Sequence, residues 1–514
     1  TPVLMATGEP NLYSDFSGGV NLQSAPYLLK ENQCRDARNV HSTTVGSIKK
    51  RPGMVGVLSD STPYLDAAYP IHSIFPATTS AFIAVGKQDS ASNDRIVKIT
   101  STGTVSSLTS GTGKTLGKRW EFAQGPTSGG QGPIYGINGT DAAIYWDGSS
   151  SSIGAWTSSG AVSVPNACTM ILYHLDKFWL SGHPSYPGRI WSTGFTSGYP
   201  DPRLFDTDYI DDVDPIDGQV ITGLGKVGPY LLVFKSHKTY VLSDPTGRAY
   251  RPIHSTIGCA AKRSIVETSV GTFFLSEDMG VCVTDGVDVT PVSDNILPLL
   301  LSAADSNAAN LSKACATFHR NSYFLSVPTV DSENDLTLEY QLDTKSWWIH
   351  TCSASQFALL DPSGTPKLYA AASQSKELYE AFVDGVYSDD DAAYSDCYWE
   401  GPFWPWGMPH LNKRISQFRA DGQGAWETYA STAFNTDYEV LEELVWETND
   451  TDFLFGGTGT FGGGSDEFGP AAGITERRYY TPGFGRSWSL RIVSDDPSIM
   501  EIFSISGFAR PRAD

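Results

Sequence analysis

Six aspartates fall within one short stretch and form the densest group of possible metal ligands in the sequence. Clustered carboxylate oxygens are the ligands that Ca²⁺ prefers, but the stretch lacks the spacing of an EF-hand loop. A solvated acidic loop is therefore the favoured interpretation, with a calcium site as the alternative, and no metal or other cofactor is predicted elsewhere. The calcium candidates are Asp206, Asp208, Asp211, Asp212 and Asp214, with Asp217 close behind.

A second group of residues could serve glycoside hydrolysis. Ser276–Gly280 fits the start of the S-x-D-x-G motif of sialidase-like proteins, but that motif is a hairpin turn and the expected Trp does not follow. Such an enzyme also needs clustered arginines to hold a carboxylate, a tyrosine nucleophile and an acid. The candidate arginines are scattered singly, so a hairpin without catalytic residues is predicted. They are Arg189, Arg203, Arg248, Arg263 and Arg320.

The remaining motifs also indicate no enzyme. None of the nine histidines pairs at i,i+4, and no G-x-S-x-G is present, which argues against zincins and serine hydrolases. The Gly-rich loop at 456–469 lacks the G-K-[ST] of a phosphate cradle, and Asp466 and Glu467 would repel phosphate. It is predicted to be a flexible loop with Phe461 among its apolar tips. We expect no catalytic residue and no bound cofactor.

The seven cysteines are odd in number, widely spaced and without a C-x-x-C pair. This pattern indicates reduced, buried thiols in a protein that is assembled in a cytosol. No apolar run is long enough to span a bilayer, and the polar start does not resemble a signal peptide.

Composition indicates an all-β protein. Only 18% of the 514 residues are charged, whereas Gly (50) and Pro (30) are plentiful, which favours short strands joined by many turns. The net charge of −21 argues against sequence-specific binding of nucleic acid. An acidic surface would suit a channel through which DNA slides, because Lys and Arg contacts to phosphate would retard it. Simple solubility is the favoured explanation of the charge.

A pair of strand patterns repeats loosely between residues 66 and 395. Successive buried strands lie roughly 42 to 53 residues apart, the period of a four-stranded propeller blade. We expect a β-propeller of six or seven irregular blades, preceded by an N-terminal extended segment (1–65) that joins a platform or closes the propeller. The buried strands are expected at 81–85, 134–137, 177–181, 230–234, 272–276, 322–326 and 367–371.

Residues 396–514 are predicted to form a separate small β-domain, a sandwich or platform. Its start is densely aromatic and includes Trp404 and Trp406, which suit a contact between domains or subunits, with saccharide stacking as the alternative. Alternating residues at 487–493 and 500–508 predict a β-hairpin. Helical turns are expected only around 297–309.

The order of these parts resembles the tail-nozzle (tail-hub, tail tubular protein B-like) family of short-tailed bacteriophages. The resemblance rests on Gly18-Gly19-Val20-Asn21 followed by Arg51-Pro52-Gly53, on Val233-Phe234-Lys235 with Tyr240, and on Phe274–Val281. It implies a non-enzymatic structural protein of the virion tail, made in the bacterial cytoplasm. Six copies would surround the DNA-ejection channel.

The resemblance also implies partners. These are a portal-adaptor ring, tail fibres, and a needle or plug protein, while double-stranded DNA would pass through the lumen without specific binding. Lys49, Lys50 and Arg51 are the residues expected to dock the adaptor, and Phe461 is expected to gate the channel. Two other functions stay open: a carbohydrate-binding or sialidase-like propeller, and a tail-tip or baseplate propeller of a long-tailed phage.

Overall fold

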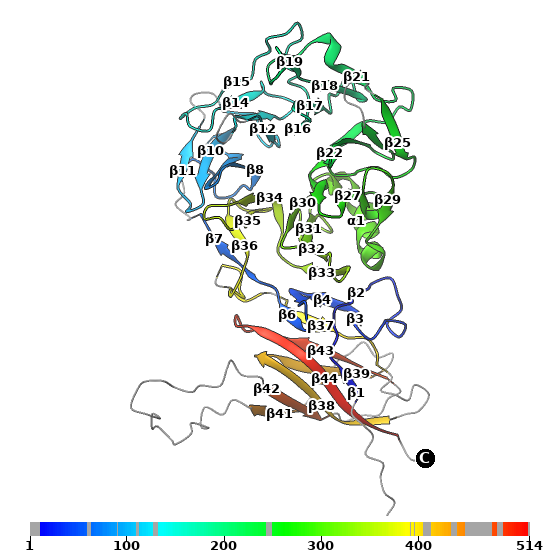
Figure 1. Ribbon diagram of the computed structural model, residues 1–514. Helices are drawn as coiled ribbons and strands as arrows, with labels where there is room; N and C mark the ends of the chain where they lie inside the picture. The colour runs from blue at the N-terminus through cyan, green and yellow to red at the C-terminus, as the bar shows by residue number, and fades with distance from the viewer. Residues whose placement is uncertain are drawn as a thin grey trace, which may run out of the picture. The chain divides into compact units, whose positions relative to one another are not determined.

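The computed structural model describes most of the chain (Figure 1). It is all-β, as the composition predicted, with a single α-helix, α1 (Leu297–Leu311), among the described residues. This helix lies where helical turns were expected. Three short 3₁₀ turns accompany it: η1 (Thr207–Tyr209), η2 (Lys262–Ser264) and η3 (Asp294–Ile296). The described residues are 11–58, 63–89, 91–108, 113–126, 132–242, 249–390, 392–394, 396–404, 413–432, 439–440, 442–447, 475–480 and 487–511.

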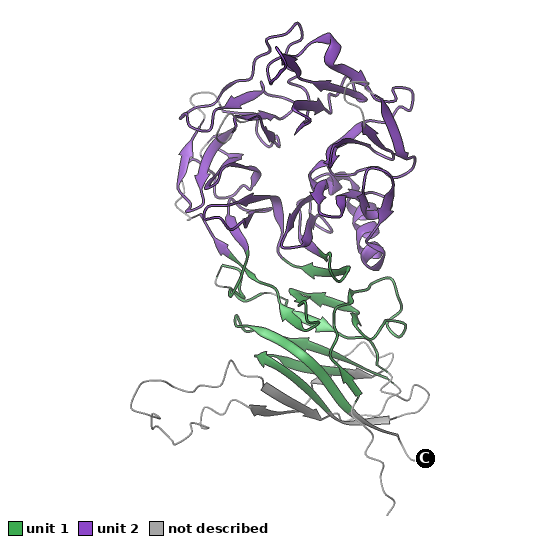
Figure 2. Ribbon diagram, in the orientation of Figure 1, with its two compact units in different colours: residues 1–54, 340–351, 382–514 green, residues 55–339, 352–381 purple. Residues whose placement is uncertain are grey.

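The chain divides into two compact units (Figure 2). Unit 1 contains residues 1–54, 340–351 and 382–514, and unit 2 contains residues 55–339 and 352–381. The N-terminal segment therefore belongs to the same unit as the C-terminal residues.

Seven four-stranded sheets follow one another along the middle of the chain, and we number them sheet 1 to sheet 7. Sheet 1 consists of β8 (Ile71–Thr78), β9 (Ala81–Lys87), β10 (Asp94–Thr100) and β11 (Val105–Ser107). Sheet 2 consists of β12 (Glu121–Gln124), β13 (Ile134–Ile137), β14 (Ile144–Trp146) and β15 (Gly154–Ala155). Sheet 3 consists of β16 (Met170–His174), β17 (Lys177–Ser181), β18 (Arg189–Ser192) and β21 (Ile210–Asp212). Between β18 and β21 the chain forms the hairpin of β19 (Gly194–Thr196) and β20 (Tyr199–Asp201).

Sheets 4 to 7 repeat this plan. Sheet 4 consists of β22 (Ile221–Val227), β23 (Tyr230–Lys235), β24 (Thr239–Leu242) and β25 (Tyr250–His254), and sheet 5 of β26 (Val266–Thr268), β27 (Gly271–Ser276), β28 (Gly280–Thr284) and β29 (Val289–Pro291). Sheet 6 consists of β30 (Cys315–His319), β31 (Ser322–Val327), β32 (Leu336–Gln341) and β33 (Ser346–His350). Sheet 7 consists of β34 (Ala354–Leu360), β35 (Lys367–Ala372), β36 (Leu378–Val383) and β7 (Gly53–Gly56).

The strands that the sequence marks as the start of each repeat are the second strands of these sheets. All seven expected positions fall on β9, β13, β17, β23, β27, β31 and β35. Each is preceded by a further strand that the pattern did not reveal. The reason is burial: β9 and β23 have neighbours on both sides and are almost wholly buried, so they carry continuous apolar runs. The first strands carry shorter apolar runs, and β22 and β30 alternate between buried and partly exposed residues, so they give a weaker signal.

The first strands of the sheets form a closed circle within unit 2. Each contacts the first strand of the next sheet, and β34 of sheet 7 returns to β8 of sheet 1. Figure 2 shows the sheets of unit 2 following one another around a ring. Residues from the beginning of unit 2 close it, since the Val57 N–H donates to the Leu378 carbonyl at 2.8 Å. A closed ring leaves few unpaired strand edges.

Apolar cores lie between neighbouring sheets. One core joins Phe82 and Val97 of sheet 1 to Leu360 and Tyr369 of sheet 7. The rings of Phe82 and Tyr369 meet edge to face, with centroids 4.8 Å apart. Each sheet thus buries its faces against its neighbours, and the first and last sheets are packed in the same way as the others.

Unit 1 contains a seven-stranded sheet, a five-stranded sheet and a short parallel pair. Its strands are β1 (Asn11–Tyr13), β2 (Gly19–Val20), β3 (Gln33–Cys34), β4 (Asp36–Arg38), β5 (Val40–Ser42), β6 (Ile48–Lys50), β37 (Tyr398–Glu400), β38 (Lys413–Gly424), β39 (Glu427–Thr432), β40 (Glu439–Val440), β41 (Glu442–Glu447), β42 (Thr475–Tyr480), β43 (Trp488–Val493) and β44 (Met500–Pro511). N-terminal strands complete both larger sheets: β6 pairs with β44, and β4 pairs with β37. The hairpin expected from 487–508 does not form, because β43 pairs with β37 and β39 whereas β44 pairs with β38.

Truncating Phe82 tests the contact that closes the ring. We expect Phe82→Ala to lower the free energy of unfolding by about 3–5 kcal/mol, because the substitution leaves a cavity between the first and last sheets. Leu359→Ala is the matched control, since Leu359 is 36% exposed on the same unit. Urea unfolding followed by tryptophan fluorescence measures both variants, and equal midpoints for the two would contradict this packing.

Candidate functional site

The centre of unit 2 contains a small cavity of about 220 Å³. It is lined from the strands β8, β12, β16, β22, β30 and β34 and from the residue just before β26. All seven sheets therefore contribute to it. The contributing apolar residues include Phe75, Phe122, Ile171, Leu224, Ile265, Ala316 and Phe357.

Arg263 crosses this centre. It lies in η2, ahead of sheet 5, and its side chain is 4% exposed. Its guanidinium donates to Glu121 Oε1 at 2.8 Å, to the His72 carbonyl at 2.7 Å and to the Trp120 carbonyl at 2.9 Å. A fourth bond reaches Ser73 Oγ at 3.0 Å. One side chain thus connects the start of sheet 5 to sheets 1 and 2.

Lys262 adds a second cation to the same cluster. Its Nζ lies 3.1 Å from Glu121 Oε1 and donates to the Thr169 carbonyl at 2.6 Å. Burial raises the pKa of the Glu121 carboxyl, but the charges of Arg263 and Lys262 outweigh burial, so that the pKa is lowered overall. Burial lowers the pKa of Lys262, and Glu121 only partly offsets this. Two cations therefore share one carboxylate, which is 16% exposed.

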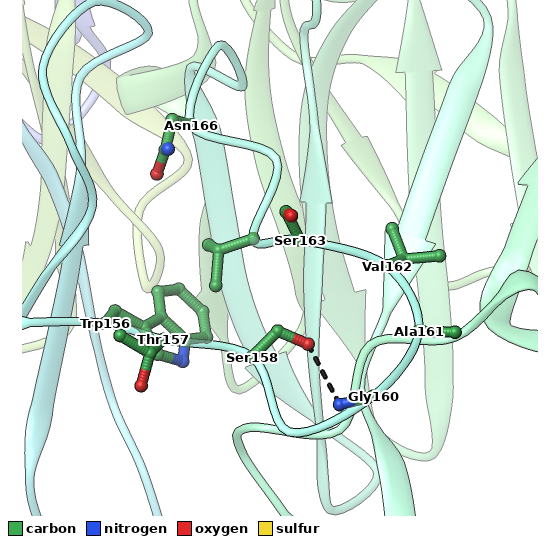
Figure 3. Close-up of a pocket in the computed structure, with 9 residues that line it drawn as sticks. Trp156, Thr157, Ser158, Gly160, Ala161, Val162, Ser163 and Asn166 are labelled. Atoms are coloured by element: carbon green, nitrogen blue, oxygen red, sulfur yellow. Dashed lines mark hydrogen bonds between the residues drawn. The ribbon is translucent and has the colours of Figure 1, made fainter.

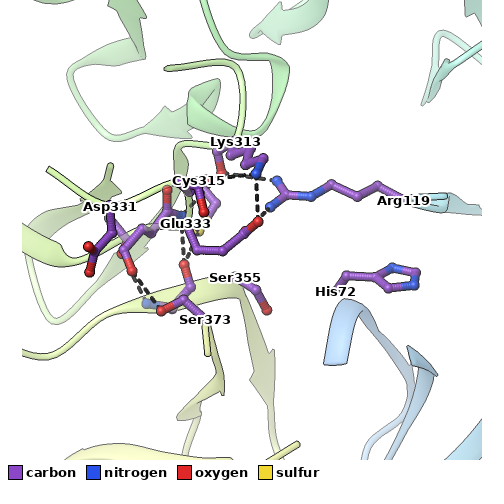
Figure 4. Close-up of polar contacts among 12 residues, drawn as sticks. His72, Arg119, Lys313, Cys315, Asp331, Glu333, Ser355 and Ser373 are labelled. Carbon is purple, nitrogen blue, oxygen red and sulfur yellow. Dashed lines mark hydrogen bonds and ion pairs between the residues drawn. The ribbon is translucent and has the colours of Figure 1, made fainter. Parts of the chain in front are cut away.

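A larger cavity of about 270 Å³ opens on the N-face of unit 2, which we define as the side at which the first strands begin. Arg119 reaches it from the residues ahead of β12, and Lys313 reaches it from those ahead of β30. Arg119 donates to the Lys313 carbonyl at 3.0 Å and approaches Glu333 at 3.4 Å. Lys313 also donates to Glu333. Figure 4 shows Arg119 and Lys313 meeting at Glu333.

The opposite wall of the N-face cavity comes from sheet 1. His72 Nε2 lies 2.9 Å from Asp94 Oδ2, which also accepts the Gly117 N–H at 2.8 Å. Asp94 Oδ1 is buried without a hydrogen-bond partner among the described residues. Tyr69 and Leu116 line the same cavity and are 44% and 43% exposed. The cavity combines cations, an acceptor and an apolar rim.

A third cavity, of about 310 Å³, lies in the loop 156–166 (Figure 3). Trp156 is 4% exposed and donates from Nε1 to the Pro202 carbonyl at 2.8 Å. The Gly160 N–H donates to Ser158 Oγ at 3.1 Å. The cavity has no charged lining residue, and its only aromatic ring is buried, so it offers no stacking platform.

The acidic stretch is neutralised by its own neighbours. Asp217 Oδ1 accepts from the fully buried Lys235 at 2.7 Å, and Asp214 Oδ2 accepts from the Tyr240 hydroxyl at 2.7 Å. Asp212 is held by two bonds from Arg189, of 2.8 and 2.9 Å. The hydrogen bond from Lys235 helps to lower the pKa of Asp217 against the opposing effect of burial.

Three more of the candidate ligands complete this stretch. Asp206 accepts the Thr207 N–H at 2.7 Å, Asp211 accepts from Tyr250 at 3.3 Å, and Asp208 is exposed. Within the residues that the structure describes, no three His, Cys, Asp or Glu side chains are placed to hold a metal ion. Lys235 and Tyr240, which the sequence analysis noted in the segment from Val233 to Tyr240, instead bind this loop to sheet 4.

The basic run at the end of β6 is mostly internal to unit 1. Arg51 is fully buried, donates to Asn39 Oδ1 at 2.9 Å and to Asp389 Oδ1 at 3.0 Å, and lies 4.2 Å from the centre of the Tyr394 ring. Lys50 is also buried and donates to Ser494 Oγ at 3.2 Å. Lys49 is half-buried. Arg51 and Lys50 therefore support unit 1 from within, and the docking of an adaptor by Lys49, Lys50 and Arg51 stays a prediction.

Trp404 is likewise buried, at 1% exposure. Its ring stacks on Tyr13 with centroids 4.4 Å apart and lies 5.8 Å from that of Trp399. The contact is within unit 1, between the N-terminal strand and the aromatic segment. Trp406, Phe461 and the Gly-rich loop 456–469 lie outside the described residues.

Three further predictions concern the cysteines, the S-x-D-x-G motif and membrane-spanning segments. All seven cysteines are free and buried, as predicted. Ser276 pairs with Gly280 across the β27–β28 turn, which confirms the hairpin reading of the S-x-D-x-G motif. Among the described residues, no helix is long and apolar enough to cross a bilayer.

The sequence reasoning missed the two charged clusters of unit 2. Arg263 was noted as an isolated arginine, and Arg119, Glu121, Lys313 and Glu333 were not singled out. These residues come from four separate stretches of the chain, and only the closed ring brings them together. The one local signal is Lys262-Arg263 directly after the apolar Cys259-Ala260-Ala261, because adjacent cations next to a buried segment need partners.

No family model matches the chain, and no curated protein matches it.

Replacing Glu121 tests the central cluster. We expect Glu121→Gln to lower the free energy of unfolding at neutral pH by about 3–5 kcal/mol, because the buried Arg263 and the half-buried Lys262 lose their shared carboxylate. The pKa of Glu121 is lowered in the folded protein, so its contribution is complete above its ordinary value of 4.5 and is lost as the pH falls through the folded value. The difference from the native protein should therefore shrink below about pH 4.

Denaturant unfolding between neutral and acid pH measures this effect. Glu380→Gln is the control, because Glu380 pairs with a partly exposed Lys367 and such pairs contribute at most about 1 kcal/mol. A Glu121→Gln variant with the stability of the control at neutral pH would show that the cluster does not hold the ring together.

Addition of calcium tests whether the acidic stretch binds a metal ion. We expect millimolar Ca²⁺ to leave the melting temperature unchanged, because Asp212, Asp214 and Asp217 already have protein partners. Magnesium at the same concentration controls for ionic strength in differential scanning fluorimetry. A rise in melting temperature that is specific to calcium would restore the metal interpretation.

Proposed function

We propose that the chain is a structural subunit of a bacteriophage tail, a nozzle or hub protein that surrounds the DNA-ejection channel. In this proposal unit 2 is a seven-bladed β-propeller and unit 1 is the β-platform. The protein is not an enzyme, is assembled in the bacterial cytoplasm and acts in the virion. The observation that carries the proposal is the order of parts: an N-terminal segment built into the C-terminal β-unit, with a ring of seven sheets inserted between them.

The propeller assignment is supported by three features of unit 2. The seven sheets that contribute most of its strands have four strands each and follow sequence order, and their first strands contact one another in a closed circle. Residues at the beginning of unit 2 pair with sheet 7, the arrangement that closes propellers. For unit 1, a sandwich is supported by Phe418 of β38, whose ring meets that of Trp488 of β43 edge to face at 6.5 Å.

The size of the cavity at the centre of unit 2 limits where DNA could pass. A cavity of about 220 Å³ crossed by Arg263 is too small for a duplex. In a nozzle, therefore, the channel must run between several copies of the chain. The net charge of −21 suits surfaces along which DNA moves without binding.

Burial changes which residues can contact partners. Arg51, Lys50 and Trp404 are internal in the single chain, so the proposal assigns them to the stability of unit 1. Docking to an adaptor ring by the basic run at the end of β6 stays a prediction, and docking to fibres or a needle protein is assigned to other surfaces. Phe461 remains the proposed gating residue.

Mass in solution tests the proposed assembly. We expect light scattering over a concentration series to give six copies, either for the chain alone or on addition of the adaptor protein from the same phage. Six copies would leave room for a channel enclosed by the ring of chains. A strict monomer under every condition would contradict the nozzle and favour a propeller that binds saccharides, which is the second candidate.

The observation that favours the saccharide-binding propeller is the N-face cavity, where the charged side chains of Arg119, Lys313 and Glu333 converge. A tail-tip or baseplate protein of a long-tailed phage would share the features of the first candidate. A ring with another number of copies, such as three, would favour it over the nozzle.

A further inference from the structure

We propose that the N-face cavity of unit 2 binds a monosaccharide-sized molecule that carries a carboxylate, such as a uronic acid. Arg119 and Lys313 would hold the carboxylate, and Lys87, which lines the same cavity, would donate to a hydroxyl group. The inference does not rest on the proposed virion role, because it concerns a site within one unit of a single chain.

Arg119 has the capacity to bind an anion. A guanidinium has five N–H donors, and this one makes only two contacts with the described residues, one of them at 3.4 Å. The side chain is 19% exposed and lines the cavity. Planar pairs of N–H groups match the two oxygens of a carboxylate.

The surrounding charge favours an anion. Four cations, Arg119, Lys313, Arg263 and Lys262, share two carboxylates, Glu333 and Glu121, in the two linked clusters. The cavity is also lined by Lys87, which pairs with Asp66, and by Asp94 beside His72. Burial and then the charge of Arg263 are the main causes that lower the pKa of Arg119. A bound anion would relieve the repulsion between the cations, whereas a cation would increase it.

The opposite wall offers a hydrogen-bond donor, Lys87 Nζ, which donates to Asp66 Oδ2 at 2.8 Å and has two further N–H groups. The Asp94 side chain is only 1% exposed, and its Oδ2 accepts from the Gly117 N–H and contacts His72, so it supports this wall from within. Figure 4 draws the His72 ring below the side chain of Arg119.

The rim and the size narrow the ligand class. Tyr69 and Leu116 are large apolar residues that are nearly half exposed, and they provide a surface for the C–H face of a sugar ring. The volume of about 270 Å³ lies below the range of cavities for drug-sized molecules, so a single sugar fits it better than an oligosaccharide does. Hydroxyls, one carboxylate and an apolar face together describe a sugar acid.

Titration calorimetry of the full chain with D-glucuronate tests the proposal, with D-glucose and inorganic phosphate as comparison probes. We expect glucuronate to bind at least about tenfold more tightly than glucose or phosphate, a difference of about 1.4 kcal/mol. Equal binding of phosphate would show an anion site without a sugar site and would overturn the proposal. Absence of glucuronate binding would overturn it as well.

Variants locate the site. Leu116→Trp should abolish binding by filling the cavity without removing an ion pair, and Arg119→Gln should weaken it at least about tenfold. Leu359→Trp changes another exposed leucine of unit 2 and should bind as the native chain does.

Melting curves confirm that each variant is folded, and Lys313→Met replaces Arg119→Gln if the latter is not. Undiminished binding in folded Leu116→Trp would place the ligand elsewhere. These results are independent of the number of copies in the assembly.

Discussion

The ion pair of Arg263 with Glu121 is the contact on which unit 2 depends most. A ring of sheets packed side by side has apolar cores between neighbours, but its centre is lined by backbone carbonyls and by only the first strand of each sheet. Arg263 donates to two of those carbonyls, of His72 and Trp120, while Glu121 balances its charge. The pair thus satisfies polar groups that the apolar cores cannot reach, and it connects sheets that are not adjacent.

The N-face cavity is a consequence of the same constraint. Lys262 and Arg263 bring two cations to one carboxylate at the centre, and Arg119 and Lys313 lie beyond them with Glu333. Replacing the cations by apolar residues would remove the repulsion, but the carbonyls of His72 and Trp120 would then have no donor. The excess of positive charge at the centre of an acidic protein therefore has a structural cause, and it also attracts small anions.

Much of the fold could be predicted from local pattern, and the reason lies in burial. The second strands of the sheets are mostly covered on both faces, so β23 and β27 appear as largely continuous apolar runs. Edge strands give little signal; β15 is Gly154-Ala155 and exposed on both residues. The pairing of β6 and β4 with C-terminal strands had no local signal, because it depends on register between segments more than 350 residues apart.

The charged clusters could not be predicted for a related reason. Arg119 and Glu333 are separated by 214 residues, and each is unremarkable in its own sequence neighbourhood. Conversely, the aspartates at 206–217 are close in sequence and suggested a metal site, yet folding gives them to Arg189, Lys235 and Tyr240. Proximity along the chain overstated one site and concealed the other. A ring fold makes this outcome general, since every sheet contributes one or two residues to the centre from distant parts of the sequence.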